Sequence, residues 1–451
     1  MAQRKQVRKL DHDVLEQINL DAAGADVGNE EIWVTVPRGR DAEATQEFGT
    51  FTADLRRIAD WLTACRVTTL AMESTGVYWI PLYELLESRG FDVCLVNARH
   101  VKNVAGRKDD ISDSQWLQQL HTYGLLHASF RPAEHICALR ALVRHRDMLI
   151  THRSAHIQHM QKALQQMNIK LTTVLSDITG VTGMKIIRAI VSGVRDPYVL
   201  AGHRHGQCHR SVEQIALALE GNYRVEHLFT LQQALELYDF YAQQLQACDE
   251  QLEVMYTACE ARPTDQPQPK PRTRKRRKNQ PYFDLRMQMY RVAGVDLVAV
   301  DGLDALTVQK VIAEIGTDMS CWPTHKHFGS WLGVAPQHQI TGGKIKSRGT
   351  AKNANRAATA LRVAAQSLWR NDSSLGAFYR RLKARHGPAK ATTATAYKLA
   401  RIIYHMLKEQ QPYRDPGATA YQQQHRERAV RNLRRKAAQL GYHLEEGGAP
   451  S

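Results

Sequence analysis

The chain has 451 residues, enough for two or three domains, and its 43% hydrophobic and 24% charged residues are ordinary for a globular protein. It has no apolar run of bilayer-spanning length, no apolar leader after its basic start, and seven scattered cysteines without a C-x-x-C pair, which argues against a membrane anchor, a signal peptide and a disulfide framework. The net charge of +16 predicts a polyanionic partner, because lysine and arginine release counterions from phosphates; the alternative is a generally basic protein without such a ligand.

The first segment alternates short strands and helices. Strands joined by a tight turn are predicted at residues 22–29 and 31–37, and a strand or turn at residues 47–51. The following segments read in order as helix 52–66, buried strand 67–72, helix 78–89, buried strand 91–97 and helix 114–126. An antiparallel start followed by strand–helix alternation predicts a mixed sheet covered by helices.

Four acidic residues occupy comparable places in this pattern. Asp26 and Glu73 end predicted strands, whereas Asp110 and Asp113 open the helix beyond a third strand. Three-residue spacing puts the last two carboxylates on one helical face, where a hard cation such as Mg²⁺ would offset their repulsion. The alternative is unrelated surface acids, with the helix-entry pair favoured by the helix dipole. We expect all four to converge on one edge of the sheet.

The motifs around these acids resemble the N-terminal domain of the insertion-sequence DEDD transposases. They are G-A-D-V-G at 24–28, M-E-S-T-G-V-Y-W at 72–79, V-N-A at 96–98 and K-D-D-I-S-D at 108–113. Asp109 stands where the family commonly has threonine, which leaves two adjacent candidate ligands. We favour Asp110, because only Asp110 has Asp113 three residues further on.

The resemblance implies an α/β RNase H-like (RuvC-like) domain over residues 18–132. By match, its metal site comprises Asp26, Glu73, Asp110 and Asp113, with Mg²⁺ (or Mn²⁺) as the ion. The family's members are understood as bridge-RNA-guided serine-type recombinases. The implied partners are therefore DNA, a structured guide RNA and further copies of the chain in a dimer or tetramer, in the cytoplasm of a prokaryotic cell and without a membrane.

Residues 133–262 are predicted to be helical. From Leu231 to Met255, apolar residues alternate four and three apart in a heptad seam, which predicts a coiled-coil partner. That partner is either the 133–168 helix of the same chain or a second subunit, and the alternative is one stripe of a monomeric bundle. Because members of the family work as oligomers, the resemblance favours some contact between subunits.

A proline-rich basic linker over residues 263–282 marks the next boundary. Its like charges cannot be buried together, so we expect a flexible segment that touches nucleic-acid backbone, or else a solvated tether. The basic residues proposed for this contact are Arg274, Lys275, Arg276 and Arg277. A mainly α C-terminal domain over residues 283–410 and a basic helical tail over residues 411–451 follow.

A hydroxyl group stands beside two glycines in the C-terminal domain. Thr341 precedes Gly342 and Gly343, and such glycines let a DNA backbone approach. The cations grouped around it are Lys344, Lys346, Arg348, Lys352 and Arg356. The segment resembles the family's C-terminal transposase domain, whose nucleophile before the glycine pair is serine.

Threonine keeps that hydroxyl but adds a methyl group that restricts the rotamer. Thr341 is our predicted nucleophile, with Ser347 or impaired strand transfer as alternatives. We therefore expect a transposase or recombinase that forms a covalent protein–DNA intermediate. The alternatives are a metal-dependent junction-resolving nuclease, in which water attacks, and a non-catalytic nucleic-acid-binding regulator.

Overall fold

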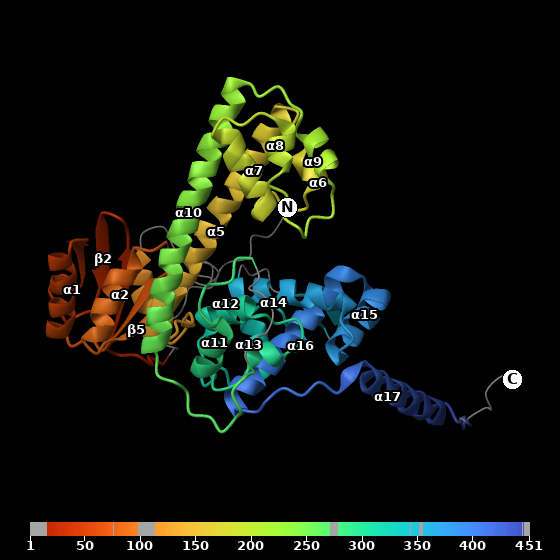
Figure 1. Cartoon of the computed structure of the whole chain (residues 1–451). Coiled ribbons are helices and arrows are strands. Elements are labelled where there is room, and N and C mark those ends of the chain that lie inside the picture. Colours follow the sequence, from red (N-terminus) through yellow and green to blue (C-terminus); the bar gives the residue numbers. More distant parts are fainter. Residues whose placement is uncertain are drawn as a thin grey trace, which may run out of the picture. The chain divides into compact units, whose positions relative to one another are not determined.

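The protein divides into two compact units, Met1–Arg131 and Pro132–Ser451, which are coloured along the chain in the computed structural model of Figure 1. The structure describes residues 16–74, 76–97, 113–270, 278–342, 344–350, 355–443 and 445, with the backbone alone at 338–340 and 344–348. Among the described helices, none is both long and apolar enough to cross a bilayer.

The first unit contains a five-stranded mixed sheet in the order β3-β2-β1-β4-β5. Its strands are β1 (Ala22–Val27), β2 (Glu31–Thr35), β3 (Thr45–Gly49), β4 (Thr69–Glu73) and β5 (Asp92–Val96). The pairs β1–β2 and β2–β3 are antiparallel, whereas β1–β4 and β4–β5 are parallel. The mixed sheet predicted from the strand–helix order is confirmed, and it is compatible with an RNase H-like fold.

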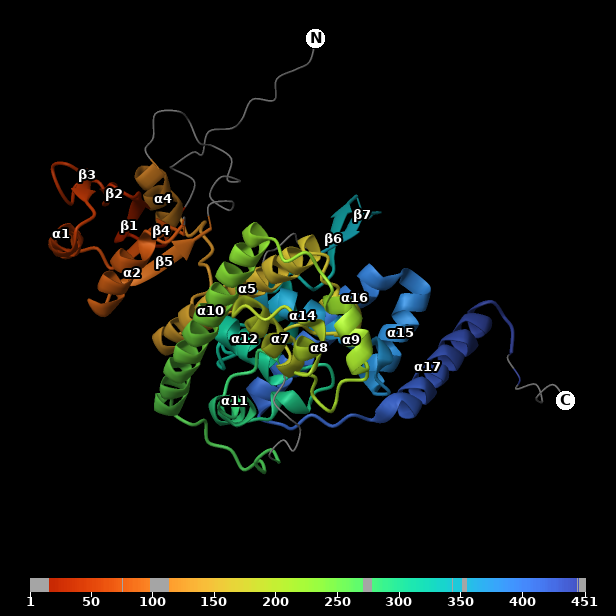
Figure 2. The same ribbon diagram turned by 45° about the horizontal axis from the view of Figure 1, so that its top comes forward.

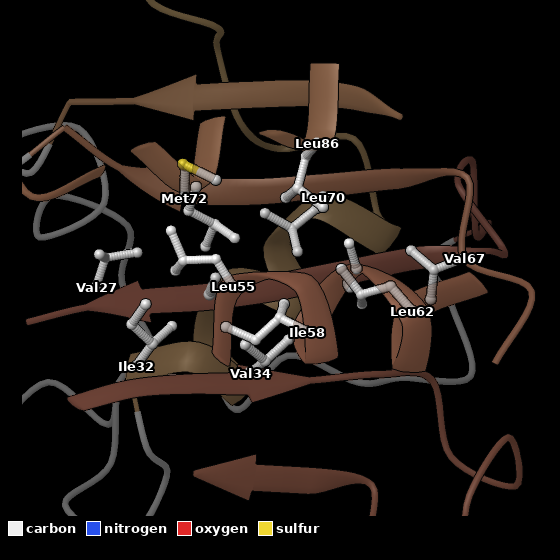
Figure 3. Close-up of a cluster of buried hydrophobic side chains, with 14 of the residues drawn as sticks. Val27, Ile32, Val34, Leu55, Ile58, Leu62, Val67, Leu70, Met72 and Leu86 are labelled. Carbon is white, nitrogen blue, oxygen red and sulfur yellow. The ribbon is translucent and has the colours of Figure 1, made fainter. Parts of the chain in front are cut away.

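Helices cover both faces of this sheet. Helices α1 (Thr52–Ala64) and α2 (Trp79–Ser88) bury their apolar sides against one face, where alternate strand residues supply the core. Figure 3 shows that core, with Ile58 and Leu62 of α1 packed against strand residues such as Leu70. Helix α4 (Asp113–Thr122) packs on the opposite face through a smaller cluster that includes Val96 and Leu117.

Two long helices pack against each other in the second unit. Helices α5 (Glu134–Gln166) and α10 (Val225–Ala258) lie side by side in both views (Figures 1 and 2). They run antiparallel, because Cys248 contacts the carbonyl of Leu142 near one end, whereas His156 stacks on Tyr241 further along. The partner of the predicted heptad seam is therefore a helix of the same chain.

A small helical cap joins the far ends of α5 and α10. It consists of α6 (Leu171–Val174), α7 (Val181–Val191), α8 (Pro197–Ala201) and α9 (Val212–Leu219) around one apolar cluster. The α5–α10 seam also buries an ion pair: the side chains of Arg146 and Asp249 are each only 4% exposed. Arg146 Nη2 donates to the Asp249 carboxylate at 3.2 Å and to the carbonyl of Asn279 at 2.9 Å. That ion pair anchors the residues that follow the basic linker block to the helix pair.

Among the described residues, the regular structure in the rest of the second unit is helical except for one two-stranded ribbon. Its helices are α11 (Leu285–Ala293), η1 (Leu297–Ala299), α12 (Ala305–Ile315), α13 (His325–Trp331), α14 (Arg356–Ser367), η2 (Leu368–Arg370), α15 (Ser374–His386), α16 (Pro388–Glu409) and α17 (Gly417–Gln439). Helix α12 joins this part to α5, because Arg144 donates two hydrogen bonds to Glu314 at 2.8 and 2.7 Å. The ribbon is made by β6 (Gln337–Thr341) and β7 (Lys344–Gly349), which the sequence pattern did not predict as strands.

Candidate active site

Two of the predicted acidic residues end neighbouring parallel strands. Ala25 of β1 and Met72 of β4 are register partners, and Asp26 and Glu73 are the next residues along each strand. Both side chains are half-buried. Residues in register on adjacent strands point to the same face, so the two carboxylates lie next to each other on one face of the sheet.

That face is the one covered by α4. Glu73 is in register with Val96, which is fully buried in the cluster beneath α4. On β1, Asp26 shares its face with Gly24, two residues earlier. A β-carbon on Gly24 would lie 2.3 Å from the backbone oxygen of Ser114 and 2.3 Å from the backbone nitrogen of Gln118. Glycine at this position therefore allows α4 to lie directly on β1.

Helix α4 runs antiparallel to β1, and this direction places Asp113. Near the end of the helix, Nε2 of His121 lies 2.8 Å from Oγ1 of Thr69, at the start of β4. Near its beginning, Oγ of Ser114 lies 2.9 Å from Oγ1 of Thr35, the register partner of Gly24. Asp113, exposed at the first residue of α4, therefore lies at the same end of the sheet as Asp26 and Glu73.

The donor chemistry at this end of the sheet suits a hard cation. Asp26, Glu73 and Asp113 offer only carboxylate oxygens, which Mg²⁺ and Mn²⁺ prefer. Asp110, the fourth predicted ligand, lies outside the described residues, as does its neighbour Asp109. Within the described part of the chain, no group of three or more His, Cys, Asp or Glu is arranged to hold a metal ion. The described acids thus share an edge without forming a complete ligand cage.

The predicted nucleophile lies at the tip of the β6–β7 ribbon. Thr341 ends β6, is exposed, and is in register with Lys344 across the turn. Gly342 has φ +55°, a left-handed conformation that a side chain would strain, so glycine suits this turn. Figure 2 shows the ribbon extending away from the neighbouring helices. A hydroxyl group at such a tip is accessible to a large substrate.

The predicted basic residues fall partly within the described chain. Lys344, Lys346 and Arg348 belong to β7, on the strand that follows the turn. Arg356 is exposed at the first residue of α14, whose N-cap is Asn355. Lys352 and the linker residues Arg274, Lys275, Arg276 and Arg277 lie outside the described residues.

Two features of the structure were not predicted from the sequence. It gave Gly24 no role beyond its motif, although the missing side chain lets α4 approach the sheet. It also missed a group of cations on α15, α16 and α17, including Arg381 and Arg428, which lie far apart in the sequence but line one pocket. The first had a signal in the glycine two residues before a strand-end acid. For the second, the basic character of the tail was visible in the sequence, but its meeting with α15 and α16 was not.

Two models of known protein families match the chain. A DEDD transposase model of the IS110 group, described as "Transposase", matches residues 23–169, and a model described as "Transposase IS116/IS110/IS902 family" matches residues 296–380. No curated protein matches the chain. The two models together cover just over half of the sequence, including the β6–β7 ribbon and the sheet edge at which Asp26, Glu73 and Asp113 lie, called the acidic edge below. The chain belongs to the IS110-type family of DEDD transposases, which are DNA-processing enzymes.

Proposed function

We propose that this transposase cuts and exchanges DNA strands with two sets of groups, the acidic edge of the first unit and the Thr341 hydroxyl of the second. The observation that carries the proposal is the placement of Asp26 and Glu73, on adjacent strand ends, at the end of the sheet where Asp113 begins α4. A bound cation would offset the mutual repulsion of carboxylates grouped in this way.

In this scheme Asp26, Glu73, Asp110 and Asp113 hold Mg²⁺ (or Mn²⁺), and the bound ion supplies charge stabilisation for a phosphate under attack. The role of the chain is orientation. Register between β1 and β4 fixes the spacing of the first two carboxylates, and the contact of α4 with Gly24 fixes the third. This domain is the one for which we propose the RuvC-like assignment.

The Thr341 hydroxyl is the proposed nucleophile. Its Oγ1 forms a bond to a backbone phosphorus as the bond from that phosphorus to one deoxyribose oxygen breaks. The hydroxyl proton leaves Thr341, and the released deoxyribose oxygen takes up a proton to become a hydroxyl group. The product is a phosphothreonyl link that a second strand end can attack to complete the exchange. Lys344 and Lys346 on β7 and Arg356 on α14 are the proposed phosphate contacts in the described chain.

The remaining parts of the proposal concern partners and assembly. A structured guide RNA would choose the sites by base pairing, with the basic linker residues contacting its backbone. A dimer or tetramer would supply more than one acidic edge and more than one Thr341. The boundary at 132/133 for the first domain, and the division of the remaining chain at 262/263, 282/283 and 410/411, are likewise proposals.

The decisive experiment is a search for a protein–DNA adduct. The full chain is incubated with Mg²⁺, donor DNA and the transcript that flanks its element, and the products are separated on a denaturing gel. A band of protein joined to DNA, absent in Thr341→Ala and retained in Ser347→Ala, is the expected result. Retention in Thr341→Ala with loss in Ser347→Ala would transfer the role to Ser347.

Cleavage without any adduct would instead indicate attack by water, as in a junction-resolving nuclease. A third outcome separates catalysis from regulation. If Asp26→Asn and Glu73→Gln leave every measured activity unchanged, the chain acts as a nucleic-acid-binding regulator.

A further inference from the structure

A pocket of about 940 Å³ opens between α15, α16 and α17, and of its lining residues only Phe378 falls within a family-model match. Its volume is in the range of small-molecule sites. The lining has a strong excess of positive charge. Its cations are Arg381, Arg385, Lys398, Arg401, Arg414 and Arg428. The only carboxylate in the lining is Glu409, whose Oε1 lies 2.6 Å from Nδ1 of His405.

Aromatic rings, rather than carboxylates, hold the inner cations in place. The ammonium nitrogen of Lys398 lies 4.7 Å from the ring centroid of Phe378 and 5.1 Å from that of Tyr421. The guanidinium carbon of Arg381 lies 5.7 and 5.6 Å from the same two centroids. Cation–π contacts position a charge without neutralising it, so both side chains remain cationic and can attract an anion.

The charge of this pocket is not balanced within the described chain. Across those residues, none of the six lining cations forms an ion pair with a carboxylate. Nε of Arg381 is buried and has no hydrogen-bond partner there, although its Nη1 donates to His425 at 2.6 Å. Burial and the charges of Arg381 and Arg401 lower the pKa of Lys398, and the Asp415 carboxylate only partly opposes them. An unsatisfied buried donor among like charges is costly, and a bound anion would remove that cost.

Another wall of the pocket is apolar, and this favours an anion that carries an apolar group. Tyr397, Ile402, Met406 and Tyr413 provide aromatic and aliphatic surface next to the cations. A bare inorganic anion would leave this surface in water, whereas a phosphate that carries a flat base would cover it. The ligand that fits both walls is an organic phosphate of about the size of one nucleotide.

We propose that this pocket binds a single nucleotide, with its phosphate on Arg381, Lys398 and Arg428 and its base against the apolar wall. The choice of a nucleotide over another organic phosphate rests on the proposed function. The nucleotide comes either from free nucleoside monophosphate or from an unpaired residue of a nucleic-acid strand. A paired residue within a duplex is held in its stack and cannot enter the pocket without being flipped out.

The test measures binding by the full chain in EDTA, so that no strand is cut. One arm uses radiolabelled adenosine monophosphate in equilibrium dialysis, and the other uses fluorescein-labelled ten-residue single strands and a hairpin duplex in anisotropy titrations. Two pairs of exposed arginines on or beside α17 make the comparison. Arg414→Gln with Arg428→Gln removes two charges from the lining, whereas Arg431→Gln with Arg435→Gln removes two from outside it.

The lining pair is expected to weaken binding of at least one unpaired ligand by about tenfold or more, because two charge-assisted contacts are lost. The outer pair is expected to change it by less than about threefold. Weakened adenosine monophosphate binding identifies a free nucleotide as a source, and weakened single-strand binding alone identifies a strand. Arg381→Gln should reproduce the loss, and circular dichroism checks that it folds.

The proposal is overturned if both pairs weaken binding equally, since charge alone would then explain it. It is also overturned if duplex binding falls as much as single-strand binding, or if neither unpaired ligand responds to the lining pair. These outcomes are independent of the covalent chemistry. Thr341→Ala should bind both unpaired ligands like the unaltered chain, so loss of adduct formation and loss of the pocket can be told apart.

Discussion

The backbone nitrogen of Gln118 on α4 lies only 2.3 Å from the point where a β-carbon on Gly24 would stand. No flexible side chain can move aside, because the contacts are with helix backbone. Gly24→Ala should therefore push α4 off β1 and lower the free energy of unfolding by about 1–3 kcal/mol, the usual range for overpacking. Thermal or denaturant unfolding measures the loss, and displaced Asp113 should reduce strand cleavage as well.

Gly206→Ala is the matched control, because a β-carbon there meets nothing within 4 Å. Its unfolding free energy should stay within about 0.5 kcal/mol of the unaltered chain. Equal stability of the two variants would contradict the close contact between α4 and β1.

Removing one charge from the acidic edge should abolish catalysis while the fold survives. Asp26→Asn or Glu73→Gln keeps side-chain size but weakens oxygen ligation of a cation, so strand cleavage should fall by about a hundredfold or more. Cleavage is followed with labelled DNA, and binding of the same DNA is measured in parallel. Glu31→Gln, an exposed strand residue in the same sheet, should cleave normally. Normal cleavage by both edge variants would refute the metal site.

Shortening the nucleophile should accelerate adduct formation. Thr341→Ser keeps the hydroxyl group and removes the methyl group that restricts its rotamer. We expect protein–DNA adduct to accumulate faster in Thr341→Ser than in the unaltered chain, and not at all in Thr341→Val, which keeps the shape without the hydroxyl. Adduct formed by Thr341→Val would show that another group attacks.

Breaking the buried ion pair of the α5–α10 seam should be far more damaging than breaking an exposed one. Asp249→Ala leaves the Arg146 guanidinium buried without its carboxylate, a loss of about 3–5 kcal/mol. Asp239→Ala, which removes the partner of the half-exposed Arg188, should cost less than about 1 kcal/mol. Arg146→Met combined with Asp249→Leu should recover most of the stability, and chemical denaturation compares all three.

Acid should loosen α4 before it unfolds the sheet. Burial lowers the pKa of His121 below its ordinary 6.5, and the Asp92 charge partly opposes this. Since the unfolded state then takes up the proton more readily, stability is complete above pH 6.5 and declines as the pH falls below it, by at most about 1.4 kcal/mol per pH unit. Hydrogen exchange of the α4 amides between pH 7.5 and 5.5 measures the decline, and His121→Asn should remove it.

Features of this protein that depend on neighbouring residues in the sequence could be predicted, whereas features that depend on distant contacts could not. Four of the strands and the helices between them were predicted from short apolar runs and turn residues, whereas residues 47–51 were left as a strand or a turn. Helix α10, which carries the predicted heptad, packs along α5. The pattern could not choose between α5 and a second subunit, because both satisfy the same seam. The β6–β7 ribbon was missed, since glycines and basic residues concealed a strand signal that depends on cross-strand pairing. Roles for the acidic edge and Thr341 remain predictions.

The β6–β7 ribbon has only two strands, and such a ribbon is marginally stable in water unless something covers it. If Thr341 is the nucleophile, its hydroxyl oxygen therefore lies on a segment that a bound DNA strand helps to order. Part of the free energy of DNA binding then goes into ordering the ribbon so that Thr341 is in position to attack. DNA that binds too weakly to supply that free energy would not be attacked. The low stability of the ribbon would then limit the reaction of Thr341 with other DNA of the host cell.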